Sequence, residues 1–310
     1  MASSVARILP KRKLHALCCI TALWLGCHLA TAQESEIPFQ LQDNLIRVPV
    51  VINGSNVEAV LDSGAGAFAL DRSFALSLGL RPGAENGKIP GGGDPVPMFP
   101  VQLAQIEFGP ERLSQLAGIA LDMGSLSSSA GFSVKALLGK PVFLLQAISI
   151  DYPHRKISFL PAGKEVACVD PIPFSLAGGT PVVLATLQAT PTSGPRTLRL
   201  IVDLGTRHYA AMLGGSFLDT PDGMLLEQIG KPMQVGTGTG GAVAGSTVKV
   251  SRLTVGRHDF PDIEIALTRQ VGAFSSGIAD GALGVPLWEA GTITFDYPRH
   301  HICFGFPKPF

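Results

Sequence analysis

The sequence predicts an all-β protein made of two similar halves, with few and short helices. Three observations lead to this prediction: a composition rich in turn residues, motifs that repeat in order along the chain, and apolar runs with the length of strands. The chain has 36 glycines and 24 prolines among its 310 residues, and only 15% of its residues are charged. This mixture is typical of short strands joined by many turns.

The repeat organises the whole chain. Five motifs of the first half return in the same order in the second half, with offsets of 135, 141, 147, 145 and 145 residues. One matching tripeptide means little, but five matches in one order indicate a duplication. We therefore expect two lobes, residues 33–165 and 166–310. The motif pairs are Ile37-Pro38-Phe39 with Ile172-Pro173-Phe174, Leu61-Asp62-Ser63-Gly64 with Val202-Asp203-Leu204-Gly205, Ile106–Gly109 with Leu253–Gly256, Leu138-Gly139-Lys140-Pro141 with Leu283-Gly284-Val285-Pro286, and Ile150-Asp151-Tyr152-Pro153 with Phe295-Asp296-Tyr297-Pro298.

The apolar runs of each half have the length of strands, and a turn joins the first two. In the first half, Val48–Ile52 and Val57–Leu61 flank Asn53-Gly54, which is the strongest short signal for a hairpin. In the second half, Val182–Leu187 and Leu198–Val202 flank a looser loop. Each half therefore begins with a predicted β-hairpin.

Later segments extend this interpretation. Residues 247–255 and 262–267 alternate between apolar and polar side chains, as half-buried strands do. Helices are expected to be rare. We predict one short helix that Asp71 caps, that runs to Leu78 and that Gly79 ends.

The first 32 residues have the features of a cleavable signal peptide. Arg7–Lys13 form a positive segment, Leu14–Leu29 an apolar run, and Ala30-Thr31-Ala32 the small-x-small pattern that a signal peptidase reads. Cleavage at this point leaves Gln33 as the mature start and predicts a secreted or periplasmic protein without a stable membrane span.

Two other interpretations of this segment stay open. An uncleaved anchor is one, although the apolar run is short and is interrupted by His15 and His28. A lipoprotein anchor at Cys27 is the other, although Trp24 stands where a lipoprotein box has leucine.

Charge excludes one class of partner. Four of the 24 basic residues fall in the predicted signal peptide, so the mature chain keeps 20 basic against 24 acidic residues, a formal net charge of −4. No basic tract remains that could neutralise a run of phosphates, so no nucleic-acid partner is expected. A hydrophobic content of 46% also excludes a disordered chain.

Two cysteines, Cys168 and Cys303, remain in the mature chain. In an exported protein such a pair most simply forms one disulfide, and two buried thiols are the alternative. Their spacing does not resemble a metal site, and neither a metal nor a cofactor is expected.

Asp62 and Asp203 are the candidate catalytic residues. Each follows an apolar strand at the same phase, and a glycine, Gly64 or Gly205, stands two residues later. An aspartate in such a place is costly to bury without a partner, and a pseudo-twofold arrangement of the halves would supply one. Two carboxyls about 3 Å apart share one proton, so the pair can activate a water without a metal.

These motifs carry a resemblance to a known family. The segment Val57–Leu80, VEAVLDSGAGAFALDRSFALSLGL, resembles the first-lobe signature of retropepsin-like and pepsin-like aspartic proteases. Leu137-Leu138-Gly139 and Ala282-Leu283-Gly284 match the apolar-apolar-Gly element that passes behind each catalytic loop in that family. The Asp-Tyr-Pro motifs near the end of each half are similar to those of bacterial members. The resemblance covers nearly all of the mature chain.

The resemblance implies the acid-protease fold, with two β-barrel lobes related by pseudo-twofold symmetry. It also implies an aspartic endopeptidase that cleaves a peptide or protein substrate without a covalent intermediate. Separately, we expect a monomer. Ser63 takes the place of the hydroxyl that braces the two catalytic loops, and Thr206 takes that of a hydroxyl that can bond the second aspartate.

Family members close a hairpin flap over the substrate. Two glycine-rich stretches lie in the corresponding part of each half, and their composition fits a mobile hairpin. The candidate flap glycines are Gly91, Gly92 and Gly93 in the first half and Gly236, Gly238 and Gly240 in the second.

The second motif departs from the family at Leu204, where a threonine or serine is expected. One half of the reciprocal brace is therefore missing, at a cost of about 1 kcal/mol. In addition, Ala65 stands where the second half has Thr206, so the carboxyls receive fewer hydrogen bonds. Fewer such bonds raise the apparent pKa values of the pair. We therefore predict activity at weakly acidic to neutral pH.

The sequence also allows or excludes several other functions. A protein of the same fold that binds peptides or another ligand without cutting is the main alternative, because of Leu204. Asp62 alone would be read as a turn residue. The stretch Gly236–Gly241 matches a dinucleotide-binding pattern but precedes a strand, so that function is rejected. A serine hydrolase is disfavoured because no Gly-x-Ser-x-Gly elbow is present.

Overall fold

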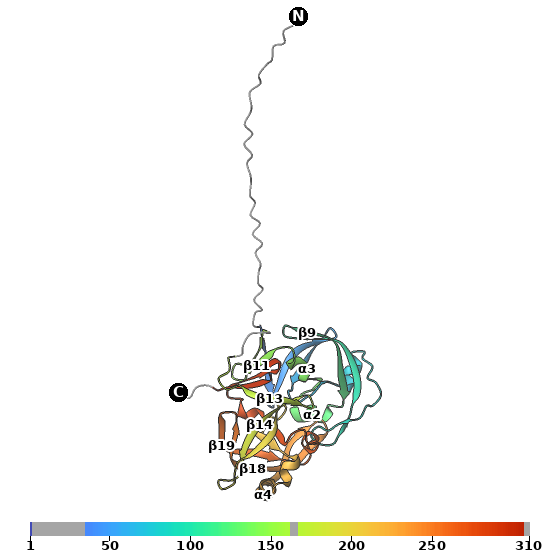
Figure 1. Cartoon of the computed structure of the whole chain (residues 1–310). Coiled ribbons are helices and arrows are strands. Elements are labelled where there is room, and N and C mark those ends of the chain that lie inside the picture. The colour runs from blue at the N-terminus through green and yellow to red at the C-terminus, as the bar shows by residue number, and fades with distance from the viewer. Residues whose placement is uncertain (2–34, 162–166, 307–310) are drawn as a thin grey trace. The chain divides into compact units, whose positions relative to one another are not determined.

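A computed structural model describes residue 1, residues 35–161 and residues 167–306 (Figure 1). Apart from Met1, the predicted signal peptide lies outside the described residues, as do its cleavage point at Gln33 and the predicted lobe boundary at residues 165 and 166. The described residues from Ser35 to Phe306 belong to one compact unit. Over the described part of the chain, no helix is both long and apolar enough to cross a membrane.

The first half forms a barrel from a 7-stranded sheet in the order β2-β3-β4-β10-β5-β9-β8, and pairing of β3 with β8 closes it. The predicted hairpin is present as β3–β4, with Asn53 and Gly54 at φ 49° and 81°, the left-handed region that a tight hairpin turn needs. The strands are β2 (Gln40–Gln42), β3 (Leu45–Ile52), β4 (Ser55–Leu61), β5 (Phe68–Asp71), β8 (Phe99–Phe108), β9 (Glu111–Leu121) and β10 (Ala136–Leu138).

The second half repeats this barrel. Its strands follow the order β13-β14-β15-β20-β16-β19-β18-β17, with β14 also pairing with β18. In both halves the strand before the aspartate pairs in parallel with the short apolar strand of the apolar-apolar-Gly element, β4 with β10 and β15 with β20. The strands are β13 (Ile172–Ala177), β14 (Thr180–Gln188), β15 (Arg196–Val202), β16 (Ala211–Leu213), β17 (Lys231–Gly238), β18 (Gly241–Val255), β19 (His258–Leu267) and β20 (Gly281–Leu283).

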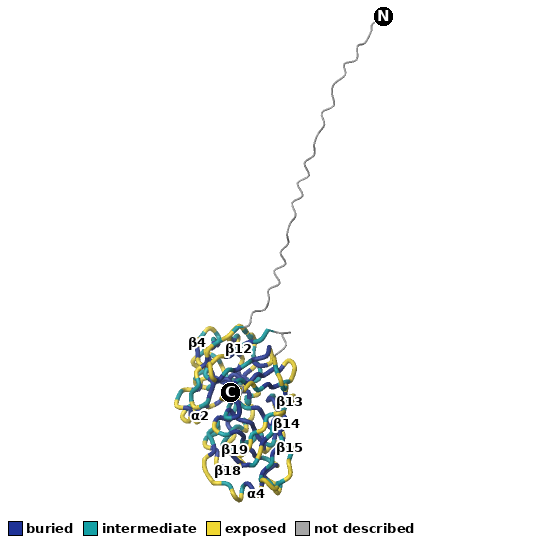
Figure 2. Tube along the Cα trace, turned by 90° about the vertical axis from the view of Figure 1, so that its left-hand side faces the viewer, coloured by how far each residue is buried: buried dark blue, intermediate teal, exposed yellow. Residues whose placement is uncertain are grey.

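Strands from both halves join in one further layer, in the order β1-β12-β11-β21-β22-β13. The junction is the antiparallel pairing of β11 with β21. One buried apolar core runs through both barrels and this layer, seen as the dark blue segments in Figure 2. The strands are β1 (Ser35–Pro38), β11 (Ala147–Asp151), β12 (Lys156–Leu160), β21 (Thr292–Asp296) and β22 (His301–Gly305), and a separate short ribbon holds β6 (Lys88–Ile89) and β7 (Val96–Pro97).

Helices are short, as predicted. The helix α1 (Arg72–Ser77) begins at Asp71, whose Oδ1 accepts hydrogen bonds from the backbone N–H groups of Ser73 and Phe74 at 3.0 and 3.1 Å. The others are α2 (Gly124–Ala130), α3 (Lys140–Phe143), η1 (Gly215–Asp219), α4 (Pro221–Ile229), α5 (Gly272–Ser275), η2 (Val285–Leu287) and η3 (Tyr297–Arg299).

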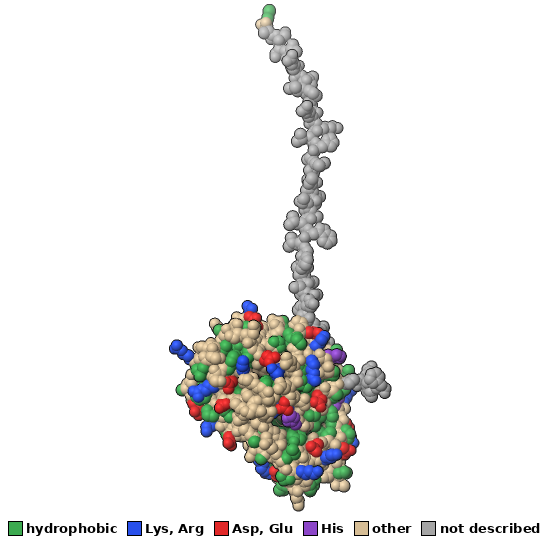
Figure 3. Space-filling model, turned by 180° about the vertical axis from the view of Figure 1, so that it is seen from behind, with side chains coloured by type: hydrophobic (Ala, Val, Ile, Leu, Met, Phe, Trp, Pro, Cys, Tyr) green, Lys and Arg blue, Asp and Glu red, His purple; other side chains and the backbone are tan. Residues whose placement is uncertain are grey.

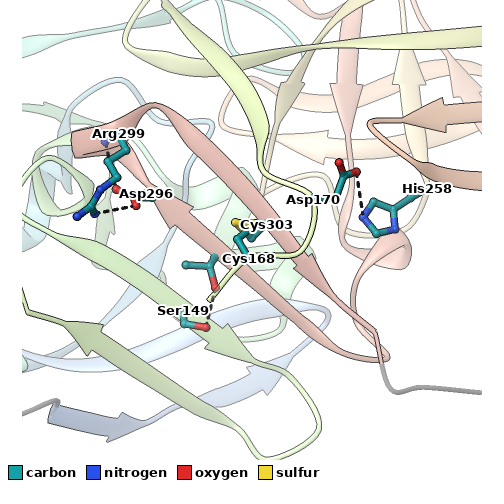
Figure 4. Close-up of a disulfide and its surroundings, with 8 residues drawn as sticks. Ser149, Cys168, Asp170, His258, Asp296, Arg299 and Cys303 are labelled. Atoms are coloured by element: carbon teal, nitrogen blue, oxygen red, sulfur yellow. Dashed lines mark hydrogen bonds and ion pairs between the residues drawn. A yellow bond between two sulfur atoms is a disulfide. The ribbon is translucent and has the colours of Figure 1, made fainter. Parts of the chain in front are cut away.

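A disulfide joins Cys168, just before β13, to Cys303 on β22, with their Cα atoms 5.8 Å apart. Figure 4 shows it beside the ion pairs of Asp170 with His258 and of Asp296 with Arg299. Figure 3 shows acidic and basic side chains interspersed over one face of the molecule, without a large patch of either charge.

Candidate active site

Asp62 and Asp203 lie at the ends of β4 and β15, at equivalent places in the two barrels. The Asp62 N–H donates to the Leu138 carbonyl at 3.0 Å, and the Asp203 N–H donates to the Leu283 carbonyl at 3.1 Å. Each aspartate is thus fixed to the parallel strand behind it, β10 or β20. This is the strand that holds the apolar-apolar-Gly element of that half.

The two carboxyls meet where the Asp-x-Gly loops of the two halves come together. A Cβ atom built on Gly64 would overlap the Asp203 carboxyl, and one built on Gly205 would lie 3.2 Å from both carboxyl oxygens of Asp62. Each loop therefore passes directly beside the aspartate of the other half. Glycine is needed at position 64 because any side chain there would displace the opposing carboxyl, and a side chain at position 205 would be in tight contact with both aspartates.

Hydrogen bonds to the two carboxyls are unequal. The Gly64 N–H donates to Asp62 Oδ1 at 2.8 Å, and the Gly205 N–H donates to Asp203 Oδ1 at 2.7 Å. The Thr206 hydroxyl adds a third bond of 2.8 Å, to Asp203 Oδ2. Asp62 has no equivalent of this bond because Ala65 has no hydroxyl.

Burial raises the pKa values of both aspartates. For Asp62, burial and then repulsion from Asp203 raise the pKa to about 8. For Asp203, burial also raises the pKa, but the hydrogen bond from Thr206 opposes the rise. The hydrogen bond from Thr206 thus stabilises the charged form of Asp203, and Asp62 lacks such a bond.

The Ser63 side chain connects the loop that carries Asp62 to the loop that carries Asp203. Its buried hydroxyl donates to the Val202 carbonyl at 2.8 Å and accepts from the Leu204 N–H at 3.0 Å. The reciprocal contact is missing because leucine has no hydroxyl, and the Leu204 side chain is instead buried in the apolar core. The structure thus holds one half of the brace that the family resemblance implies.

A cavity of about 430 Å³ lies in front of the pair. Both aspartates line it, and apolar side chains from the two halves form its walls on either side. Examples are Leu45, Val60 and Leu126 from the first half and Ile201, Met212 and Phe274 from the second. Carboxyls with raised pKa values that open into a largely apolar cavity are a common property of catalytic sites.

The candidate flap glycines line this cavity or adjoin it. Gly91 and Gly92, in the loop between β6 and β7, line it, as do Gly236 and Gly238 of the β17–β18 hairpin. The two glycine segments also touch each other: the Gly240 N–H donates to the Gly92 carbonyl at 3.0 Å. Gly93 forms an isolated bridge with Gly240.

Three cavity-lining residues, Arg207, His208 and Tyr209, were not predicted as part of the site. They follow the second Asp-x-Gly-Thr motif directly. The charged Arg207 at this place in the sequence is the feature that could have indicated that these residues belong to the site. His208 follows Asp203 by five positions, but its contact is with the other half: its Nε2 lies 3.4 Å from Asp43 Oδ1.

Comparisons with known proteins agree with this geometry. Residues 48–142 match a family model described as aspartyl protease, and no curated protein matches the chain. Among solved structures, the aspartic proteinase from Irpex lacteus is similar at 9% identity, over 87% of this chain and 96% of its own, with a TM-score of 0.52. A retropepsin-like aspartic protease from Rickettsia conorii aligns at 16% identity over 41% of this chain and 91% of its own, with a TM-score of 0.31.

The fold is therefore the two-lobed acid-protease fold, mostly β with two barrels and few helices, as the sequence predicts. The family-model match and this fold support membership of an aspartic protease family. The family-model match supports a peptidase function in general.

Proposed function

We propose that the protein is an aspartic endopeptidase that hydrolyses peptide bonds with a water held between Asp62 and Asp203. The observation that carries this proposal is the approach of two carboxyls with raised pKa values from equivalent strands of a duplicated fold. Such a pair holds one proton between its two members at working pH, as an acid and a base require.

The unequal hydrogen bonds assign the roles. Asp203, whose charged form is stabilised by Thr206, accepts a proton from the water, while the protonated Asp62 donates its proton to the peptide carbonyl oxygen. The water oxygen forms a bond to the carbonyl carbon, which gives a tetrahedral diol. The proton on Asp203 then passes to the amide nitrogen as the C–N bond breaks. A diol hydroxyl returns a proton to Asp62 as the new carboxyl group forms.

The setting of the site fits a peptide substrate in an exported protein. The apolar walls on both sides of the pair suit side chains on both sides of the scissile bond. The Cys168–Cys303 disulfide fits an oxidising compartment, such as the periplasm or the outside of the cell. One chain supplies both aspartates, so we propose a monomer.

Leu204 favours one alternative, a protein of this fold that binds a peptide or another ligand without cutting it. Its apolar side chain removes half of the brace between the loops. A loose pair of carboxyls would hold the water poorly and would cleave slowly or not at all.

Comparison of the wild-type protein with Asp62→Asn and Asp203→Asn tests the proposal. We expect cleavage of a denatured protein or a peptide library by the wild type at weakly acidic to neutral pH, and a loss of at least a thousandfold in each variant. Asp259→Asn, at an exposed ion pair on β19, serves as the matched control. A wild-type protein that cuts nothing between pH 3 and 8, yet binds peptides, would establish the binding alternative.

A further inference from the structure

The two loops around the aspartates are joined unequally. The Ser63 side chain reaches across from the first loop to the second, but the Leu204 side chain makes only apolar contacts and returns no such bond. Three residues after Leu204, Arg207 makes polar contacts with the opposite half.

Arg207 is almost fully buried, with 4% of its side chain exposed. Its guanidinium forms an ion pair with Asp43 and donates a hydrogen bond to the Ser129 hydroxyl at 3.2 Å. Its carbonyl oxygen accepts a hydrogen bond from the Asn44 side chain at 2.9 Å. Asp43 and Asn44 form the turn between β2 and β3, and Ser129 lies on α2, so all three partners belong to the first half.

The equivalent place in the other half is built differently. There the turn between β13 and β14 is Gly178-Gly179, and it packs against Gly66 of the first catalytic loop. A Cβ atom on Gly66 would lie 2.6 Å from the Gly178 carbonyl oxygen, so this contact is one of backbone against backbone. The ion pair is therefore present only at the loop that carries Leu204.

We propose that Arg207, with Asp43 as its counter-ion, is the positioning residue that fixes Asp203 against Asp62 in place of the missing hydroxyl at position 204. The inference rests on the proposed function of the two aspartates. A buried arginine can fix the loop in one orientation because its planar guanidinium donates to two acceptors at once. The ion pair is also costly to break, because removing either partner leaves the other charge buried without a partner.

A positioning role has a consequence for the acid–base pair itself. Repulsion from Asp203 contributes to the raised pKa of Asp62, and this repulsion weakens as the carboxyls move apart. The other charged or titratable groups near the brace are His208, 3.4 Å from Asp43, and Glu289, which Asn44 contacts at 3.3 Å. His208 contacts Asp43 and Glu289 contacts Asn44, and neither is changed in the Arg207 variants.

The test compares the wild type with Arg207→Met, which keeps the length of the side chain without its charge, and with Arg207→Lys, which keeps the charge without the fork. Arg252→Met, at the exposed ion pair with Asp259, is the matched control. The aspartate carboxyls are titrated by carbon-13 NMR, and kcat and KM are measured across pH.

For Arg207→Met we expect the titration of Asp62 to move to lower pH by at least one unit, and kcat to fall at least tenfold with KM within threefold. We expect Arg207→Lys to recover part of both changes and Arg252→Met to change neither. A lower melting temperature with an unchanged Asp62 titration would overturn the inference, because Arg207 would then contribute to stability alone.

The NMR titration does not depend on catalytic activity, so it tests the positioning role of Arg207 even if the wild type cuts no peptide. In that case the proposed function fails, and the inference stands or falls on the titration. If Arg207→Met does not fold, Asp43→Asn replaces it, with the same expected shift and the same overturning result.

Discussion

At the scale of single residues, the two aspartates differ by one hydrogen bond. Thr206 donates to Asp203, whereas Ala65 offers nothing to Asp62. In a buried site a hydrogen bond to the charged form lowers a pKa, so this difference favours the charged form of Asp203 over that of Asp62. The sequence showed the alanine and the threonine, and the structure adds the burial that raises both pKa values.

The raised pKa of Asp62 predicts how stability depends on pH. Between its ordinary value of 3.8 and about 8, the folded state holds a proton on Asp62 that the unfolded state releases. Stability therefore falls as the pH rises through this range, with a limiting slope of about 1.4 kcal/mol per pH unit for one proton.

Asp62→Asn cannot ionise at this position, so its free energy of unfolding should decline less between pH 4 and pH 8. We expect the variant to gain stability relative to the wild type as the pH rises, measured by urea unfolding at several pH values. Parallel curves for the two proteins would show that Asp62 titrates in the ordinary range.

At the scale of elements, the two glycine-rich segments form a continuous contact. The Asp94 N–H donates to the Gly240 carbonyl at 3.1 Å, and the Gly240 N–H donates to the Gly92 carbonyl. A Cβ atom on Gly240 would overlap the Asp94 carbonyl oxygen, so the contact requires glycine there. The glycines of these segments thus allow the two backbones to approach closely, in addition to any flexibility that they give the hairpin.

Gly240→Ala should therefore separate the two segments. We expect the amide hydrogen of Asp94 to exchange at least tenfold faster in this variant, since its acceptor is displaced. Gly236→Ala is the matched control, because a Cβ atom there lies 3.9 Å from its nearest neighbour, Met212 Cε. Equal exchange rates in both variants would mean that the segments do not depend on this contact.

At the scale of the whole molecule, the duplication places equivalent aromatic residues across the interface between the halves. Trp288 of the second half donates from Nε1 to the Tyr152 hydroxyl of the first at 3.3 Å. Phe143 stands in the place of Trp288 in the other half and stacks on Tyr297, with ring centroids 5.4 Å apart. Phenylalanine has no donor, and the buried Tyr297 hydroxyl has no hydrogen-bond partner among the described residues.

This difference predicts opposite effects for two equivalent substitutions. Tyr152→Phe leaves the Trp288 N–H buried and unpaired, and should lower the free energy of unfolding by about 1–3 kcal/mol. Tyr297→Phe removes an unpaired hydroxyl, so it should be neutral or stabilising. Urea unfolding of both variants provides the measurement, and equal losses in the two would contradict the pairing.

Local signals in the sequence were enough for much of the fold. Asn53-Gly54 between two apolar runs specifies a hairpin, and Asp71 before a short helical segment specifies a cap, because both depend on residues a few positions apart. The order of the repeated motifs placed Asp62 and Asp203 at equivalent points. The signal peptide and its cleavage at Gln33 remain predictions.

Arg207 and Asp43 illustrate what the sequence could not specify. They are 164 residues apart, and neither belongs to a repeated motif, since the equivalent turn holds two glycines. Their pairing depends on how one barrel packs against the other. Hydrophobic periodicity and sequence motifs describe residues that are near one another in the chain, so they do not predict that packing.

The sequence by itself determined the duplication, the strands around each aspartate and the chemistry that two such carboxyls can perform. Only the tertiary structure decided that the two carboxyls lie beside each other and are buried, that Thr206 donates to one of them, and that Arg207 pairs with Asp43 of the other half. The physical reason is that strands and turns are encoded by neighbouring residues, whereas burial, repulsion between charges and ion pairing arise when distant segments pack together.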